Sequence, residues 1–211
     1  MKWRATLHLR AACAAWLLAA ACAPAPPPLP PPPPPPLPPS IPEIPPPPPC
    51  ARVAHIEVIK SLRLLRAHCE GGRVVEMTVA LGRETAGAKQ RAGDSRTPEG
   101  RYRVSGPPRS SRFHLFVPID YPSVEDAESA RADGRISAAA YARILAAHER
   151  GEAPPDDTPL GGHLGFHGEG DRWRGDSVDL DWTYGCVAVS DAHIDFLAER
   201  TPVGTPVVIE P

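Results

Sequence analysis

The stretch DWTYGCVAVSDAHIDFL, residues 181–197, contains Cys186, the main candidate for a chemically functional residue in this chain. Gly185 precedes Cys186, and glycine permits backbone conformations in which consecutive amides point at one oxygen, as an oxyanion hole requires. The upstream segment GFHGEG (165–170) supplies His167. An imidazole beside a thiol can take its proton and make the sulfur a nucleophile. We therefore expect Cys186 and His167 to act as a pair.

The same stretch predicts how the chain ends. Ser190 and Asp191 can cap a short helix over 192–200, and a β-branched run at 205–210 predicts a final strand. Upstream, short alternating or β-branched runs bounded by turn residues predict strands at 55–59, 62–68, 73–82 and 112–119, and residues 94–104 predict a turn followed by another strand. The alanine-rich run 137–149 predicts a helix. We therefore expect residues 51–211 to form one mainly-β domain with two or three short helices.

Cysteine spacing bears on the first two predicted strands. Cys50 and Cys69 flank them, and we place the intervening turn at Lys60–Ser61. In a hairpin with that turn the two cysteines lie nearly opposite each other, so a disulfide and two separate thiols are both open. An oxidising compartment favours the disulfide, which would leave Cys186 as the odd thiol.

Residues 1–21 have the pattern of a secretion signal. A basic start, with Lys2 and Arg4, precedes an apolar run that is shorter than the ~20 residues needed to span a bilayer. Cys22 falls where the small-residue cleavage motif ends, in a segment that resembles a bacterial lipobox. Lipidation of Cys22 and simple cleavage after Ala21 are both open, and a lipid there would tether the chain to a membrane.

A proline-rich segment, residues 22–50, separates the signal from the domain. Residues 24–49 contain 19 of the 30 prolines, which excludes helix and sheet there. Polyproline II at about 3.1 Å per residue would extend roughly 80 Å. We interpret this segment as a stiff tether, with a disordered remnant as the alternative.

Composition and spacing exclude other classes of protein. The formal net charge of −2 and the 6% aromatic content argue against nucleic-acid binding. His163 and His167 have a helical i, i+4 spacing, but the glycines around them argue against a helix, so we predict no metal site. We interpret the acidic residues within 176–181 as a solvated loop.

Two motifs together carry a resemblance to a known family. His167-Gly168 is followed, after a short spacing, by Thr183-Tyr184-Gly185-Cys186-Val187. This arrangement resembles the L,D-transpeptidase catalytic (YkuD-like) family, in which HG precedes [Ser/Thr]-x-Gly-Cys-[Ile/Val]. The resemblance covers most of residues 53–210, including TPEGRYRV (97–104). It implies a YkuD-like β-sandwich with a cysteine–histidine site in a groove.

The resemblance also implies a reaction on peptidoglycan. Cys186 would attack the amide between the third residue of a stem peptide and its D-alanine, and His167 would accept the thiol proton and later donate to the leaving amine. Gly185 would contribute a backbone amide to the oxyanion hole. Resolution of the thioester by an amine gives a cross-link, whereas water gives a carboxypeptidase or another hydrolase. Substrate contacts are expected from Gly168, Thr183, Tyr184 and His114.

One position departs from the common family pattern. Ala188 stands where an arginine usually follows the cysteine by two residues. With the segments 112–122 and 181–191, this resembles the YafK-type branch, which is associated with hydrolysis that releases a lipoprotein from peptidoglycan. We expect an L,D-transpeptidase of cell wall assembly or remodelling. A hydrolase and a non-catalytic peptidoglycan-binding lipoprotein are the alternatives.

The expected surroundings follow from the same resemblance. Family members are exported, which agrees with the signal and tether and predicts a location in the periplasm or cell envelope. The partners would be peptidoglycan stem peptides, with a peptidoglycan-linked lipoprotein if the hydrolytic alternative holds. Membrane contact would come only through a lipid on Cys22, and no cofactor is expected.

Overall fold

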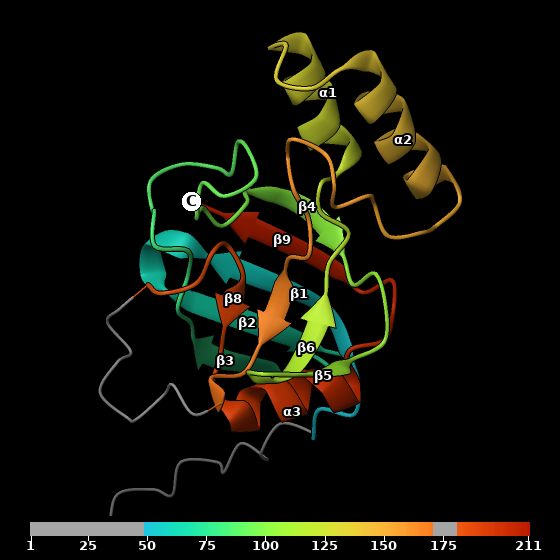
Figure 1. Cartoon of the computed structure of the whole chain (residues 1–211). Helices are drawn as coiled ribbons and strands as arrows, with labels where there is room; N and C mark the ends of the chain where they lie inside the picture. Colours follow the sequence, from blue (N-terminus) through green and yellow to red (C-terminus); the bar gives the residue numbers. More distant parts are fainter. Residues whose placement is uncertain (1–48, 171–180) are drawn as a thin grey trace, which may run out of the picture. The chain divides into compact units, whose positions relative to one another are not determined.

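The computed structural model describes residues 49–170 and 181–211. The predicted signal segment 1–21, Cys22 and the tether up to residue 48 lie outside this part of the chain. The described residues form two β-sheets and three α-helices, which confirms the expected mainly-β fold (Figure 1). No helix in these two ranges combines the length and apolar character needed to cross a membrane.

The larger sheet has five strands in the order β3-β2-β1-β9-β4. β1 (Val53–Ile59) and β2 (Leu64–Cys69) form an antiparallel hairpin, and β3 (Val74–Thr78) continues the meander. β9 (Pro206–Glu210) lies parallel to β1, and β4 (Gly100–Arg103) is antiparallel to β9. β9 therefore lies inside the sheet, between β1 and the edge strand β4, and joins the meander to β4.

The first hairpin turns one residue later than the sequence predicts. Ile59 pairs with Leu64, so the turn comprises four residues rather than being centred on Lys60–Ser61. A single 3-10 turn, η1 (Lys60–Leu62), makes the reversal, and Arg63 closes it with φ 51° and a bond from its amide to the Lys60 carbonyl. Because η1 and Arg63 both lie between the paired residues Ile59 and Leu64, the centre of the turn moves one residue toward the C-terminus.

Cys50 and Cys69 form a disulfide at the open end of this hairpin. A register shift between Val53 and His55 places Val53 opposite Cys69. Cys50 lies beyond the last pair of the ladder, with its Cα atom 5.4 Å from that of Cys69. The disulfide therefore joins the segment before β1 to the end of β2.

The smaller sheet carries the candidate site. Its order is β5-β6-β7-β8, with β5 (Arg109–Ser111), β6 (His114–Pro118) and β7 (Gly165–His167) antiparallel in turn. β8 (Val187–Ala188) runs parallel to β7, with Phe166 opposite Val187. His167 ends β7 and Cys186 immediately precedes β8, so parallel pairing brings the two motifs to neighbouring strands.

One hydrophobic core joins both sheets to the third helix. Leu65 of the larger sheet, Phe166 of the smaller sheet and Ile194 of α3 (Asp191–Arg200) all belong to it and are fully buried. Ser190 caps α3 by accepting a bond from the His193 amide, as its sequence position predicts. α3 packs against β6 and β7, which supports the strand that carries His167.

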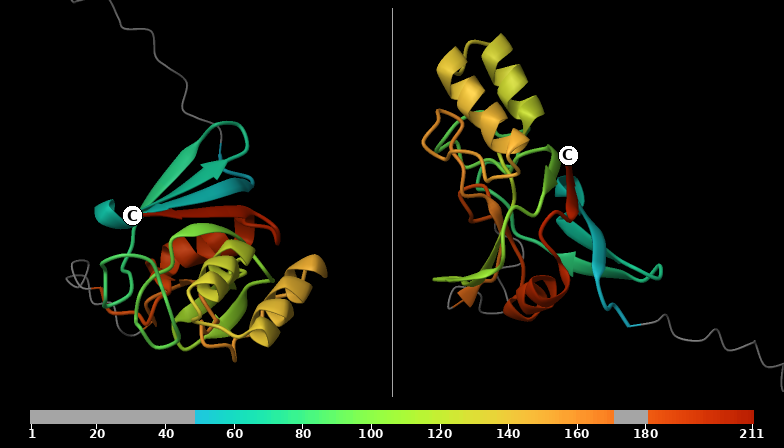
Figure 2. Two further views of the ribbon diagram at one scale, coloured as in Figure 1. Left: turned by 90° about the horizontal axis from the view of Figure 1, so that it is seen from above. Right: turned by 90° about the vertical axis from the view of Figure 1, so that its right-hand side faces the viewer.

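A helical hairpin is inserted between β6 and β7. α1 (Val124–Ala132) and α2 (Ala138–Glu149) lie side by side at the opposite end of the sheets from α3 (Figures 1 and 2). The hairpin has a small core of its own, formed by Ala127, Ala130, Ile136, Ala140, Ile144 and Leu160. α1 was not predicted, because it buries only two alanines and its sequence is otherwise mostly polar.

Candidate active site

The loop that carries the cysteine is anchored at Asp181. Its carboxylate accepts bonds from the Arg63 guanidinium, at 2.6 Å from Nη2, and from the Leu81 amide at 2.8 Å. The Asp181 side chain is only 13% exposed, so the interpretation of this residue as a solvated acid is wrong. The other acids of that run, Asp176 and Asp179, lie outside the described residues. The β1–β2 turn thus fixes one end of the loop.

Thr183 organises the middle of this loop. Its hydroxyl donates to the Cys186 carbonyl at 2.7 Å and accepts from the Gly185 amide at 3.1 Å. Its own amide donates to Leu81 and its carbonyl accepts from the Arg83 amide. A threonine or serine at this position can therefore close the turn from within, which gives a structural reason for that residue type in the motif.

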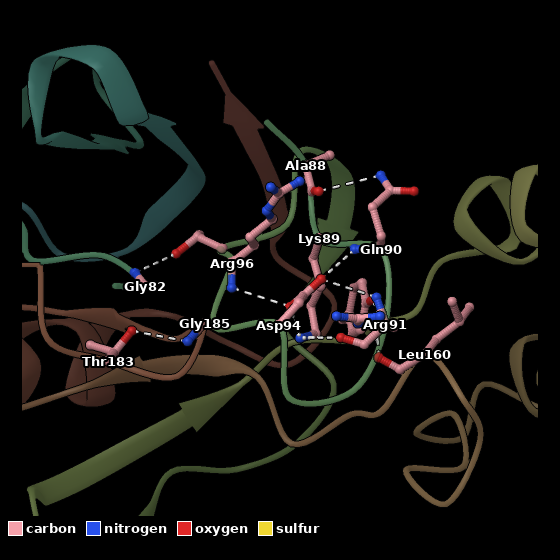
Figure 3. A network of polar contacts seen from close by, with 12 residues as sticks. Gly82, Ala88, Lys89, Gln90, Arg91, Asp94, Arg96, Leu160, Thr183 and Gly185 are labelled. Carbon is pink, nitrogen blue, oxygen red and sulfur yellow. Dashed lines mark hydrogen bonds and ion pairs between the residues drawn. The ribbon is translucent and has the colours of Figure 1, made fainter. Parts of the chain in front are cut away.

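Gly185 is required by both conformation and space. Its φ of 128° lies in a region that side-chain-bearing residues rarely adopt, and a Cβ atom would lie 2.6 Å from the Arg96 carbonyl oxygen. Its amide is already bonded to Thr183, as Figure 3 shows. The expected oxyanion donor is therefore engaged inside the loop. The role of Gly185 in this geometry is to let the loop approach Arg96.

Next to Arg96 lies a polar network around the nearly buried Lys89–Asp94 ion pair, which the sequence did not reveal (Figure 3). The Asp94 carboxylate accepts bonds from the Lys89 ammonium at 2.7 Å and from the amides of Gln90, Arg91 and Arg96. Burial raises the pKa of Asp94, but these hydrogen bonds outweigh it and leave the pKa below its usual value. The network makes a fixed support for the cysteine loop.

Cys186 combines partial exposure with a desolvated sulfur. Its thiol lies 3.7 Å from the His163 carbonyl oxygen, to which it donates. Burial raises the thiol pKa to about 11, although the Gly165 amide and the Lys89 charge act in the opposite direction. The resting thiol is therefore protonated at neutral pH, and formation of a thiolate there would require a base.

His167, the residue expected to act as that base, is buried at the end of β7. It is 4% exposed, and its Nδ1 donates to the Gly168 carbonyl at 2.6 Å, which leaves Nε2 as the proton acceptor. Phe113 stacks on the imidazole with ring centroids 4.8 Å apart, and Trp182 meets it edge-on. Burial lowers the pKa of His167, a bond to the Gly168 carbonyl raises it, and the Arg112 charge lowers it. The imidazole is consequently neutral at rest.

Cys186 and His167 line the same pocket, which has a volume of about 390 Å³. Thr183 and the 63% exposed ring of Tyr184 line it as well. The remaining lining residues are Arg83, Ser111, Arg112, Phe113, Phe116 and Trp182. A larger pocket beside Arg91 and Arg135 is lined by neither Cys186 nor His167.

Two other predicted site residues lie elsewhere. Gly168 fills a tight space, because a Cβ atom there would lie 2.3 Å from Asp191 Oδ1. His114 begins β6 with φ 68°, and its exposed ring lies 2.7 Å from the Asp195 carboxylate of α3. Neither residue lines the pocket. Both link the smaller sheet to α3 instead of contacting the space beside the sulfur.

The described residues provide no evident metal-binding cluster. Within residues 49–170 and 181–211, no three histidine, cysteine or acidic side chains are grouped to hold an ion. The ring of His163 is exposed and paired with Asp156, away from its own carbonyl contact with Cys186.

Sequence reasoning missed the two arginines and Phe113 in the pocket. Phe113 belongs to the predicted strand 112–119, but in the structure it precedes β6 and turns toward His167. Arg83 lies in a segment that carried no motif. No local pattern distinguishes an arginine that borders a pocket from one on an ordinary surface, so only the folded arrangement identifies these residues.

The chain was compared with curated proteins, solved structures and family models. A sequence comparison with curated proteins finds no match. Among solved structures, the chain is similar to an L,D-transpeptidase from Xylanimonas cellulosilytica, with 22% identity over 78% of this chain and 63% of that one, and a TM-score of 0.38. Bdellovibrio bacteriovorus Bd1075 gives 22% identity over 75% of this chain and 48% of that one, with a TM-score of 0.43. A cysteine-to-serine mutant of the Enterococcus faecium L,D-transpeptidase gives 15% identity over 75% of this chain and 50% of that one, with a TM-score of 0.41.

The chain spans less than two thirds of the length of each of these three structures. The family assignment comes from a sequence match to the family model described as the L,D-transpeptidase catalytic domain, over residues 53–209. The matched range contains both sheets, His167 and Cys186. Because this match extends over most of the chain, the protein belongs to the L,D-transpeptidase catalytic domain (YkuD) family.

Proposed function

We propose that this protein is a cysteine acyl transferase that acts on peptidoglycan stem peptides as an L,D-transpeptidase. The observation that carries the proposal is the shared pocket, which is lined by both Cys186 and the buried His167. Membership of the family supports the choice of substrate. The domain has one thiol of this kind among its described residues, since Cys50 and Cys69 are joined to each other.

In the proposed reaction, Cys186 attacks the carbonyl carbon of the third stem residue as its proton moves to His167 Nε2. A carbon–sulfur bond forms, and collapse of the tetrahedral intermediate breaks the bond to the D-alanine nitrogen, which takes the proton from His167. The neutral resting states of both groups suit this sequence, because the imidazole begins without the proton that it must accept.

The oxyanion donor in this proposal is the amide of Cys186 itself, with the Tyr184 amide beside it. The Gly185 amide is bonded to the Thr183 hydroxyl, so it is not available to the substrate in this arrangement. The Thr183 bond to the Cys186 carbonyl fixes the orientation of the adjoining peptide. A fixed amide dipole at the reacting carbonyl stabilises the developing negative charge.

An amine from a second stem would resolve the thioester by forming a new amide and regenerating the thiol. Water would instead release a shortened stem, and this hydrolysis is the second candidate function. It is favoured by Ala188, which is buried at 1% exposure in β8 where the family commonly has an arginine. Membership of the YafK-type branch and release of a peptidoglycan-linked lipoprotein belong to this second proposal.

A covalent-labelling experiment tests the nucleophile. The domain is incubated with a penem and its intact mass is measured. We expect one adduct on Cys186, which is absent in Cys186→Ser and forms more slowly in His167→Ala. A folded wild-type domain that forms no penem adduct would exclude the enzyme and favour a peptidoglycan-binding module.

Purified muropeptides then distinguish the two outcomes of the thioester. With an acceptor stem present, transpeptidation predicts a cross-linked product that Cys186→Ser does not form. A mixture that contains only shortened stems at every acceptor concentration would contradict transpeptidation and support the hydrolytic alternative.

We also propose that residues 1–21 direct export to the periplasm or cell envelope and that residues 22–50 tether the domain. A lipid on Cys22 would provide the membrane anchor. Labelling of cells with a fatty acid should mark the wild-type protein and fail to mark Cys22→Ala. Equal labelling of both proteins would exclude this anchor.

A further inference from the structure

The pocket beside Cys186 contains two guanidinium groups, from Arg83 and Arg112, and no carboxylate among its described lining residues. Neither arginine forms an ion pair within residues 49–170 and 181–211. The chain as a whole has a net charge of −2, so this concentration of positive charge is local. Such a pocket favours an anionic ligand.

Arg83 belongs to the wall that carries the nucleophile. Its guanidinium carbon lies 4.6 Å from the centroid of the Tyr184 ring, and its Nε donates to the Trp182 carbonyl at 3.2 Å. Its backbone amide donates to the Thr183 carbonyl. These contacts leave the terminal nitrogens of Arg83 without a described protein acceptor and hold them beside the loop that ends at Cys186.

Arg112 lies beside the wall of the pocket that contains His167. Its guanidinium carbon lies 4.6 Å from the centroid of the Phe113 ring, which in turn stacks on His167. The segment is held close to the β7 end, because a Cβ atom on Gly170 would lie 2.9 Å from the Arg112 carbonyl oxygen. Arg112 is therefore attached to the wall that carries the base.

We propose that Arg83 and Arg112 are two carboxylate-binding residues that select a stem peptide with a free carboxylate on each side of the scissile bond. The inference rests on the proposed function. Among the described lining residues, Arg83 and Arg112 are the two that carry a permanent positive charge. Their planar donor groups match a carboxylate in geometry and charge.

The direction of the reaction assigns one carboxylate to each arginine. His167 protonates the leaving nitrogen, so the departing D-alanine lies on its side, and Arg112 binds the α-carboxylate of that residue. The acyl group stays on Cys186, so Arg83 binds a carboxylate on the side chain of the third residue. Meso-diaminopimelate has such a carboxylate, whereas lysine has the same side-chain amine without it. The arrangement therefore selects diaminopimelate over lysine.

Three matched tetrapeptides test the two assignments in the active full-length domain. The reference peptide is L-Ala-γ-D-Glu-meso-diaminopimelate-D-Ala; the second replaces diaminopimelate with L-lysine, and the third ends in D-alaninamide. Cleavage is followed by mass spectrometry of the shortened stem. The wild type should cleave the reference peptide with a kcat/KM about tenfold higher than that for either analogue. This factor corresponds to the low end of the range for charge-assisted hydrogen bonds, because both arginines are exposed.

The variants should lose one preference each. Arg83→Gln should cleave the diaminopimelate and lysine peptides with equal kcat/KM but keep its preference for D-alanine over D-alaninamide. Arg112→Gln should show the reverse pattern. Arg73→Gln, which removes an exposed arginine from the β2–β3 turn, is the control and should keep both preferences.

The outcomes separate this inference from the proposed function. A wild type that forms a penem adduct and cleaves all three peptides equally would overturn the carboxylate sites and leave the acyl transferase intact. A variant that lowers kcat/KM for every peptide by one factor would also overturn its assignment. If Arg83→Gln or Arg112→Gln fails to fold, the wild-type preference alone decides between selection and its absence. A wild type that cleaves no peptide and forms no adduct would refute the proposed function itself.

Discussion

Raising the pH should activate Cys186 toward a simple alkylating reagent over a range far above neutrality. Burial raises the pKa of this thiol from 9.0 to about 11. Iodoacetamide reacts with the thiolate, so its rate follows the ionised fraction. At pH 7 that fraction is about 10⁻⁴ for a pKa of about 11 and about 10⁻² for a pKa of 9.0. We therefore expect alkylation to be about hundredfold slower than for an unperturbed thiol.

The measurement is the pseudo-first-order rate of alkylation between pH 6 and 10, followed by intact mass. The rate should rise about tenfold for each pH unit throughout this range, because the thiol remains mostly protonated. Cys186→Ser provides the background, and circular dichroism at each pH identifies any loss of structure. His167→Ala should change the slope little, since the neutral imidazole does not hold the resting thiolate.

A plateau near neutral pH that disappears in His167→Ala would refute this reasoning. That result would mean that the sulfur and the imidazole rest as a thiolate–imidazolium pair. Both pKa shifts would then have the opposite sign to those that burial produces here. Penem acylation is a separate case, because a bound substrate allows His167 to accept the proton during attack.

Three substitutions probe the supports of the site. Asp94→Asn leaves the buried Lys89 ammonium without its counter-ion and should lower the free energy of unfolding by about 3 kcal/mol. Urea denaturation measures this change, and an unchanged unfolding midpoint would contradict a structural role for Asp94. In the wild type, the contribution of Asp94 is present above pH 3.8 and is lost as the pH falls through its lowered pKa. Gly185→Ala adds a Cβ atom 2.6 Å from the Arg96 carbonyl, so it should destabilise by about 1–3 kcal/mol and slow penem acylation more than Gly204→Ala does. Cys69→Ser opens a link across 19 residues and should reduce stability by roughly 3 kcal/mol while the folded domain keeps its acylation rate; loss of that rate would connect the disulfide to the site.

The parts of the fold that follow local rules could be predicted from the sequence. β2 of the meander alternates buried and half-buried residues, and Ser190 caps the start of α3 as its position in the sequence predicts. The hairpin turn was placed one residue too early because η1 and the left-handed Arg63 are set by packing and not by a turn motif. α1 was missed because its stability comes from a capping box and two buried alanines, without a broad apolar face.

In the candidate site, too, residues that belong to a short motif could be predicted, whereas features set by the folded backbone could not. Cys186 and His167 stood out because each lies in a short motif that the chemistry restricts. The bond from the Gly185 amide to Thr183 could not be predicted, because a glycine in sequence does not show where its amide points. Nor could the Asp94 network, whose donors are three backbone amides and one lysine brought together by a loop. Backbone geometry decides both features.

The opposite pKa shifts of Cys186 and His167 have one physical cause. Phe113 and Trp182 cover the imidazole, and exclusion of water disfavours both the thiolate and the imidazolium, so the pair rests without charge. A protonated thiol also resists oxidation, which follows thiolate character. This matters in the oxidising compartment where we propose that the domain works, since Cys50 and Cys69 are paired there while Cys186 must remain reduced. Reactivity then depends on a bound carbonyl, because only attack on it makes proton transfer to His167 favourable.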